Sequence, residues 1–187
     1  MNSKTDCAEY LLDYLIQKSK NQGKDMGIAK FLNLLFLVVG FSCNENETGL
    51  LDIFNDFLFV PGGFFENDVQ KYILHDQFKK YKLTNCNCSI KNKNIKFARI
   101  SFPIKKRISD SVDKVITKNP DIIDLNFFDI VDIIQRWSCW KICKEYCQEK
   151  HITYTDLDLN KFHVPLFLIQ KSVRYFAAVP MNSHLVI

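Results

Sequence analysis

The stretch Phe54–Tyr72, FNDFLFVPGGFFENDVQKY, decides how the rest of the chain is interpreted. A short apolar run, Phe57–Val60, meets the break Pro61–Gly63, after which two phenylalanines and an acidic cap open a helical pattern. Proline fixes its own φ and biases the residue before it toward an extended conformation, and glycine permits backbone angles that other residues resist. The stretch therefore predicts a rigid elbow that presents Phe64 and Phe65.

A nearly continuous apolar segment precedes this elbow. Ile28–Phe41, IAKFLNLLFLVVGF, is apolar on almost every face, which in a soluble protein places a helix at the centre of the core. We expect that central helix over Ile28–Val39. The segment contains Lys30 and Asn33 and is too short to cross a bilayer, so no membrane insertion is expected.

The composition indicates a globular protein rather than a disordered one, because 47% of the 187 residues are hydrophobic and 16 are phenylalanine. The length predicts a single domain over residues 1–187. Seven cysteines, an odd number without secretory features, favour reduced thiols and a cytoplasmic location. The net charge of +4 permits a basic patch but is too small to imply nucleic-acid binding.

Apolar stripes at helical spacing recur along the chain, and a short β-hairpin interrupts them. The hairpin is predicted from two runs, Leu83–Ile90 and Ile95–Phe102, which flank Lys91–Asn94. The fold class is therefore mainly α: a single compact helical domain around a central apolar helix, with a small β-hairpin insertion. The further helices are expected over Asp6–Lys18, from Val69 to about Tyr81, from a cap at Ser109-Asp110 to Asn119-Pro120, from a cap at Asp124 or Asn126 to Trp137, and again from Ser138.

Residues 50–60 fit a short helix that runs into an extended segment, and periodicity does not decide where one ends. At the far end of the chain, Thr155–Asp158 has the residues of a helix cap, and an apolar aromatic segment follows at Pro165–Val179. We treat residues 149–187 as a C-terminal extension.

The order of these elements carries a resemblance. Ala29–Leu37, AKFLNLLFL, has the pattern of a signature helix of the type KLQKLLYLA. Phe57–Phe64 corresponds to a segment that, in a known family, is rich in aromatic residues and ends in Tyr-Gly-Pro. Val69 and Tyr72 correspond to a Val-Tyr-like pair in the helix that follows this segment. In these features the chain resembles the Panacea domain family, also described as SocA-like and phage-associated.

Later segments extend the resemblance to about residues 7–148. Ile108–Ile116 takes the place of a capped helix, Phe127–Trp137 that of a helix ending in Thr-His, and Trp140-Lys141 that of a Trp-Lys pair. The chain departs from the family at Val60–Gly63, which replaces Tyr-Gly-Pro, and it lacks the Thr-His pair.

The resemblance implies an antitoxin-type module from a bacterium or phage, which neutralises a cognate toxin by direct protein–protein contact and has no catalysis of its own. A defence-related adaptor role falls in the same class. No HExxH, Gly-x-Ser-x-Gly, P-loop or Rossmann pattern occurs, so no enzyme activity, cofactor or metal is predicted. Large aromatic side chains dominate binding energy where they are exposed, and the candidate partner-binding residues are Phe64, Phe65, Trp137, Trp140 and Lys141.

Two other interpretations stay open. Cys139, Cys143, Cys147 and His151 recur at steps of four and would line one face of a helix, while Cys86 and Cys88 share a face of a strand. Such a set could bind zinc, although four ligands rising along one helix cannot all reach one ion. Buried small hydrophobes are the simpler interpretation of the cysteines.

The second is weak contact with nucleic-acid phosphates through the hairpin tip, Lys91, Lys93 and Lys96, and through Lys105–Arg107. A turn rich in lysine and asparagine is more often simply solvated, so nucleic acid is the less favoured partner.

Overall fold

The computed structural model describes residues 3–43, 48–60, 62–149 and 162–163. The predicted cap at Thr155–Asp158 and the apolar segment Pro165–Val179 lie outside these residues. The helices and strands follow in the order α1 (Lys4–Lys18), α2 (Ile28–Ser42), the 3-10 helix η1 (Gly49–Asp52), β1 (Phe57–Val60), β2 (Gly63–Glu66), α3 (Asn67–Leu74), β3 (Tyr81–Leu83), β4 (Cys88–Ile90), α4 (Phe102–Lys118), α5 (Phe127–Gln135), α6 (Ser138–Glu149) and β5 (Phe162–His163).

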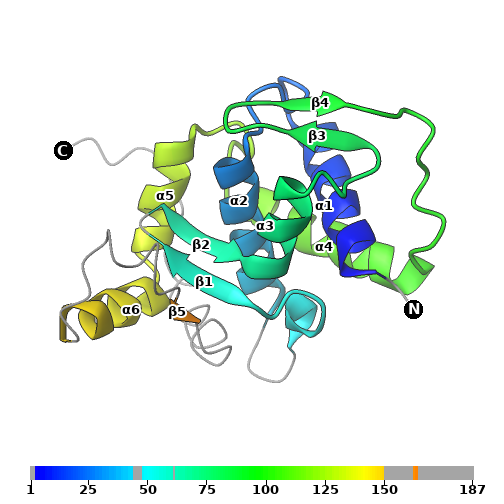
Figure 1. Cartoon of the computed structure of the whole chain (residues 1–187). Helices are drawn as coiled ribbons and strands as arrows, with labels where there is room; N and C mark the ends of the chain where they lie inside the picture. The colour runs from blue at the N-terminus through cyan, green and yellow to red at the C-terminus, as the bar shows by residue number, and fades with distance from the viewer. Residues whose placement is uncertain (1–2, 44–47, 61, 150–161, 164–187) are drawn as a thin grey trace.

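Helix α2 lies at the centre of the fold, in contact with α4, α5, α3, η1 and β2 (Figure 1). Every residue from Lys30 to Gly40 is buried. The mainly α fold around a central apolar helix is thus confirmed. Among the described residues, no helix is both long enough and apolar enough to cross a membrane.

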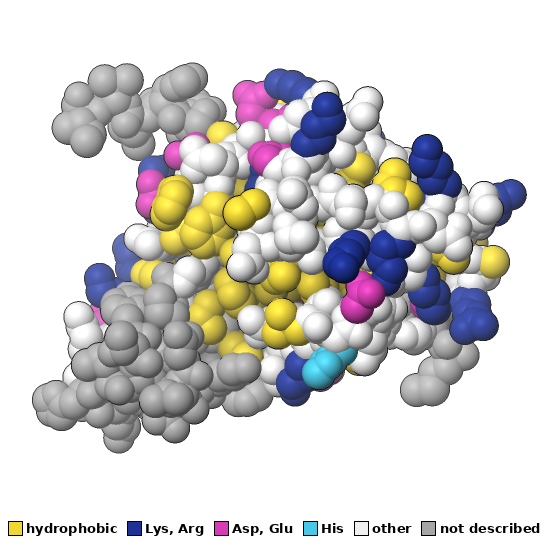
Figure 2. All heavy atoms as spheres, turned by 45° about the horizontal axis from the view of Figure 1, so that its top comes forward, with side chains coloured by type: hydrophobic (Ala, Val, Ile, Leu, Met, Phe, Trp, Pro, Cys, Tyr) yellow, Lys and Arg dark blue, Asp and Glu magenta, His cyan; other side chains and the backbone are white. Residues whose placement is uncertain are grey.

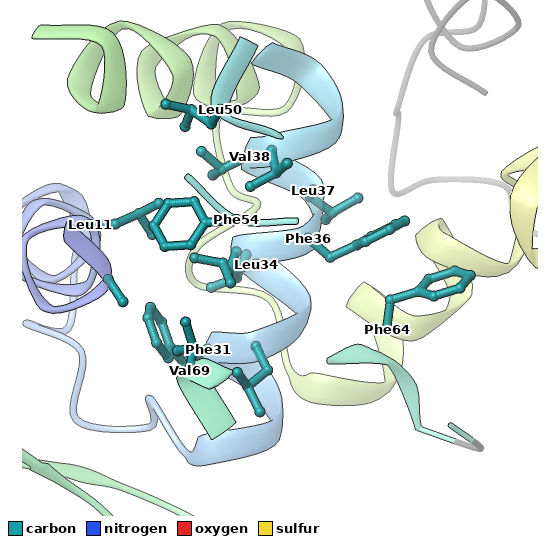
Figure 3. Close-up of a cluster of buried hydrophobic side chains, with 14 of the residues drawn as sticks. Leu11, Phe31, Leu34, Phe36, Leu37, Val38, Leu50, Phe54, Phe64 and Val69 are labelled. Atoms are coloured by element: carbon teal, nitrogen blue, oxygen red, sulfur yellow. The ribbon is translucent and has the colours of Figure 1, made fainter. Parts of the chain in front are cut away.

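The core is built around both sides of α2. One side of α2 is covered by Leu11 of α1, Leu50 and Phe54 (Figure 3). On the other side, Phe36 points from α2 toward Phe64 of the β1–β2 hairpin (Figure 3). The Phe36 and Phe64 rings stack with their centroids 4.3 Å apart. Hydrophobic burial therefore holds the hairpin against the central helix.

The predicted elbow is the turn of an antiparallel hairpin. Strands β1 and β2 pair in the register Phe57↔Glu66 to Val60↔Gly63, and β5 pairs with the other edge of β1. Gly63 has φ +127°, in a region that side chains rarely enter, and a Cβ there would overlap the side chain of Asn33. Glycine is therefore required at this position.

Asn33 is the polar link between α2 and the hairpin. It is fully buried, and its amide nitrogen donates to the Gly62 carbonyl at 2.8 Å and to the Ala29 carbonyl at 3.0 Å. Its carbonyl oxygen accepts a hydrogen bond from the Phe64 amide at 3.2 Å. One side chain thus satisfies a backbone group of the turn, at Gly62, and a backbone group of β2, at Phe64.

Helix α1 is joined to β3 by a row of buried acidic side chains. The Glu9 carboxylate accepts hydrogen bonds from the amides of Lys80 and Tyr81, at 2.6 and 3.0 Å. Asp13 accepts from the Lys80 ammonium and the Tyr81 hydroxyl, both at 2.5 Å. Glu9 therefore takes the place of a neighbouring strand at the edge of β3.

The predicted position of the hairpin in the middle of the chain is wrong. The structure pairs β3 with β4 through a turn at residues 84–87. Residues 91–101, which include all but the last residue of the predicted second strand, contain no strand, and Phe102 begins α4. Because the side chain of Glu9 fixes Tyr81 in an extended segment, the strand begins earlier than the apolar pattern suggests. The expected tip at Lys91–Asn94 instead follows the end of β4.

Two predicted helix bounds also differ from the structure. Helix α3 ends at Leu74 rather than near Tyr81, because Asp76 has φ +54° and Tyr81 belongs to β3. Helix α4 begins at Phe102, not at Ser109, with Ser101 at its N-cap and Pro103 in its first turn. Proline is favoured at the start of a helix, where its missing N–H costs nothing.

The remaining helical predictions agree with the structure. Helices α1 and α2 occupy the predicted segments, and Asn126 caps α5 by accepting hydrogen bonds from the amides of Phe128 and Asp129. Helix α6 restarts at Ser138, and residues 50–60 form η1 followed by the strand β1.

Candidate protein-binding surface

Three of the five residues predicted to bind a partner lie in the core. Phe64 and Trp137 are 0% exposed and Trp140 is 4% exposed. This corrects the expectation that they form an aromatic surface, because a side chain without solvent contact cannot meet a partner unless the fold opens. Phe65 is half-buried and Lys141 is exposed, so these two remain available at the surface.

The two buried tryptophans hold the end of the described helical region against the core: Trp140 of α6 packs on the hairpin, and Trp137, between α5 and α6, packs on α2. The Trp140 ring makes T-shaped contacts with Phe59, with centroids 4.7 Å apart, and with Phe64 at 5.8 Å. Trp137 packs between Phe36 and Phe41 of α2, at 5.5 and 5.3 Å. Their role in the folded protein is to hold three elements together.

A different set of aromatic side chains reaches the surface beside the hairpin turn. Gly62 lies close to both the Phe65 and the Phe127 rings. The Phe127 ring meets Phe128 edge-on at 5.4 Å, and Phe128 is 75% exposed. We call Phe65, Phe127 and Phe128 the aromatic face.

Apolar side chains also reach the surface on the side of the molecule that carries α5 (Figure 2). Figure 2 shows hydrophobic side chains gathered over the side of the molecule on which α5 lies in Figure 1. An exposed aromatic ring that touches another ring forms a continuous apolar contact surface. Large contiguous apolar patches are typical of interaction sites, and this is why the aromatic face is the candidate surface.

The sequence did contain a signal for Phe128. Ile130 and Ile134 of α5 are fully buried, and at 100° per residue Phe128 lies about 200° around the helix from Ile130. Phe128 must therefore point away from the core. Phe65 gives no such signal, because the register of β1 and β2 decides which of the two adjacent phenylalanines faces α2.

The cysteines occupy two separate parts of the molecule. Cys139, Cys143 and Cys147 lie along the buried face of α6, whereas Cys86 and Cys88 lie in the β3–β4 hairpin on the other side (Figure 1). His151 lies outside the described residues. Within the described ranges, no three His, Cys, Asp or Glu side chains are grouped so that they could hold a metal ion.

The thiols of Cys88, Cys143 and Cys147 also have raised pKa values. Burial raises the pKa of the Cys143 and Cys147 thiols, and burial together with the charge of Glu9 raises the pKa of Cys88 to about 12. A thiol that stays protonated at neutral pH is a poor nucleophile and a poor metal ligand. These cysteines act as small apolar side chains.

We therefore predict that only one of the seven cysteines reacts quickly in the folded protein. Iodoacetamide at pH 7.5 should label the exposed Cys86 first, because the other thiols are buried or half-buried. Intact-mass spectrometry should show one adduct that disappears in Cys86→Ser, and full labelling should require denaturant. Equally fast labelling of Cys139, Cys143 or Cys147 would contradict the described packing of α6.

Three of the cations that the sequence suggested for phosphate contact make ion pairs within the protein. Lys91 pairs with Asp76 at 2.9 Å and donates to the Phe78 carbonyl at 2.6 Å. Arg107 binds Asp52 and the Gly49 carbonyl, and Lys106 pairs with Asp110 within α4. These three side chains make contacts within the protein.

No protein-family model matches the chain, and comparisons with curated proteins and with solved structures found no match.

Proposed function

We propose that this protein is an antitoxin-like binding module that neutralises a cognate toxin, or acts as a bacterial or phage defence adaptor, by direct protein–protein contact. The observation that carries the proposal is the aromatic face. Its exposed Phe128, supported by Phe127 and Phe65, is the kind of large apolar anchor that dominates the energy of protein interfaces. The resemblance of residues 7–148 to the Panacea domain family supplies the toxin as the class of partner.

The elements that carry the aromatic face are held by hydrogen bonds, which supports its use as an interface. Phe127 and Phe128 lie in the first turn of α5, which Asn126 caps with two hydrogen bonds. The hairpin turn beside them is tied to α2 by Asn33. A preorganised surface loses less conformational entropy on binding than a mobile one. The mechanism would be occlusion, in which this face covers the active or membrane-inserting surface of the toxin.

The first experiment is co-expression with the product of the adjacent open reading frame. We expect that product to arrest growth when expressed alone, and we expect this protein to restore growth and to co-purify with it in a defined ratio. If growth is not restored and no complex is found by size-exclusion chromatography, the proposal is wrong.

A single substitution tests the face itself. Phe128→Ser should weaken the complex at least tenfold, since truncating an aromatic anchor at the centre of an interface costs about 2 kcal/mol or more. The affinity is measured by calorimetry with the purified partner. The folded structure should be unchanged, because the Phe128 side chain is mostly in solvent.

The matched control is Phe102→Ser. Phe102 is 77% exposed at the start of α4, on a different element from the aromatic face. We expect this variant to bind the partner as tightly as the unchanged protein. Equal weakening by both substitutions would show that the aromatic face has no special part in binding.

A further inference from the structure

The segment between Asp76 and Asp110 is strongly basic. Its 33 residues, 77–109, contain ten lysines and arginines and no aspartate or glutamate. Because the whole chain has a net charge of +4, the other 154 residues together carry −6. Positive charge is thus concentrated in one stretch, and Figure 2 shows dark-blue side chains gathered toward the side on which β4 and the following loop lie in Figure 1.

Half of these cations are neutralised by carboxylates within the fold: Lys79 by Asp6, Lys80 by Asp13, Lys91 by Asp76, Lys106 by Asp110 and Arg107 by Asp52. The others make no ion pair with any described residue: Lys82, Lys93, Lys96, Arg99 and Lys105. The uncompensated charge therefore lies mainly in the loop that joins β4 to α4.

A cavity lies beside that loop. It has a volume of about 370 Å³, and its lining includes the cations Lys79, Lys96 and Arg99 and the carboxylate of Asp6. Asp6 is nearly fully buried and is bound by Lys79 at 2.7 Å, so these two charges cancel. Lys96 and Arg99 are left as a net double positive charge at the cavity.

The rest of the lining is amphipathic. Ile95, Phe97 and Ala98 supply apolar surface, and Asn94 adds an amide. Cavities of roughly 300–1,000 Å³ with mostly apolar walls and a few convergent polar groups are typical of small-molecule sites. The chemistry of this wall suits a ligand with an organic body and an anionic group.

The shape of the loop is held by an unusual residue. Phe97 has φ +49°, a conformation that bulky residues rarely adopt and that persists only where the surrounding structure holds it. Its ring is fixed in place: it meets Tyr10 edge-on at 5.6 Å and lies 5.5 Å beneath the Lys80 ammonium. The packing of Phe97 thus imposes the turn that brings Lys96 and Arg99 to one cavity.

We propose that this cavity binds the phosphate group of a phosphate monoester. A phosphate monoester is close to a dianion at neutral pH, which matches the two uncompensated cations. The planar guanidinium of Arg99 can donate two parallel hydrogen bonds to phosphate oxygens, and Lys96 adds a compact charge. The apolar wall at Ile95 and Ala98 then contacts the organic part of the ligand. This site is independent of the aromatic face.

The proposal is tested by equilibrium dialysis at 50 mM salt with inorganic phosphate, AMP and adenosine. We expect AMP to bind with a 1:1 ratio, inorganic phosphate to bind more weakly, and adenosine, which lacks the phosphate, not to bind. The double variant Lys96→Gln/Arg99→Gln should weaken AMP binding at least tenfold. Both side chains are exposed, so the variant should fold normally, and its circular dichroism and melting temperature verify this.

A matched double variant separates a built site from general charge attraction. Lys114→Gln/Lys118→Gln removes the same charge from exposed positions in the later part of α4, and it should leave AMP binding unchanged. Equal weakening by the two double variants would overturn the proposal, as would binding of adenosine as tight as that of AMP.

A second arm distinguishes the source of the phosphate. Co-sedimentation with phosphatidylcholine vesicles that contain phosphatidic acid, compared with phosphatidylcholine alone, presents the same monoester on a lipid. Binding to these vesicles that is lost in Lys96→Gln/Arg99→Gln, without AMP binding, would support the site and assign it to a lipid headgroup. If AMP, inorganic phosphate and phosphatidic acid vesicles all fail to bind, the proposal is wrong.

Discussion

Trp137→Ala is expected to lower the free energy of unfolding by about 3–5 kcal/mol, the usual loss when a fully buried aromatic side chain is removed. Trp137 is 0% exposed and joins the segment between α5 and α6 to α2 through its contacts with Phe36 and Phe41. A Cβ at Gly40 would strike the Trp137 ring, so the indole fills all the space against the central helix. Its removal leaves a cavity that rigid neighbours cannot close.

The measurement is urea unfolding followed by far-UV circular dichroism, with thermal melting in parallel. The melting temperature should fall by roughly 10 °C or more for a chain of this size. Phe128→Ala is the control, since it removes an aromatic ring of the preceding helix that is mostly in solvent, and its effect should stay within about 0.5 kcal/mol. Similar losses from both variants would mean that α5 is not packed as described.

Asn33→Ala is expected to cost about 2–4 kcal/mol, because it leaves the Gly62 carbonyl and the Phe64 amide without their buried partner. Each buried polar group that loses its hydrogen bond costs about 1–3 kcal/mol. The change adds no bulk and improves the helix propensity of α2, so any loss reports the missing hydrogen bonds. Urea unfolding measures it on the same scale as Trp137→Ala.

A double-mutant cycle with Gly63→Ala makes this test specific. Gly63→Ala should be strongly destabilising alone, because its Cβ would overlap the Asn33 side chain and its φ is +127°. In the Asn33→Ala background the overlap disappears and only the backbone strain is left. We therefore expect the double variant to lose less stability than the sum of the two single variants. Additivity within about 0.5 kcal/mol would contradict the contact between Asn33 and the hairpin.

The helices that the sequence predicted best are those whose patterns leave no alternative. Ile28–Val39 is apolar on nearly every face, and only a central position buries all of it. The apolar stripe over Asp6–Lys18 correctly predicted α1. The capping residues left Asp124 and Asn126 as alternatives for α5, and the structure shows that Asn126 is the N-cap.

The errors fall where distant residues decide local structure. Residues 81–102 contain short runs that fit several pairings, and the structure selects β3 because Glu9 of α1 binds the backbone at Lys80 and Tyr81. Helix α4 begins seven residues before the predicted cap at Ser109, with Pro103 in its first turn, a position that proline favours.

The candidate sites show the same division. Phe64, Trp137 and Trp140 are large aromatic residues, as are Phe127 and Phe128, and composition alone cannot separate core from surface. Hairpin register and helix phase bury the first three and leave Phe128 in solvent. The cysteines likewise become small core side chains, as in α6, or residues of the β3–β4 hairpin, as at Cys86 and Cys88, once these elements are placed.

The sequence by itself determined that the protein is a mainly helical fold around Ile28–Val39, because burying that much continuous apolar surface requires a central helix. It also placed ten cations between Asp76 and Asp110. The tertiary structure alone decided which of them are neutralised, since ion pairs such as Lys79 with Asp6 join segments far apart in the chain. Lys96 and Arg99 meet at one cavity because the packing of Phe97 on Tyr10 sets the path of the loop.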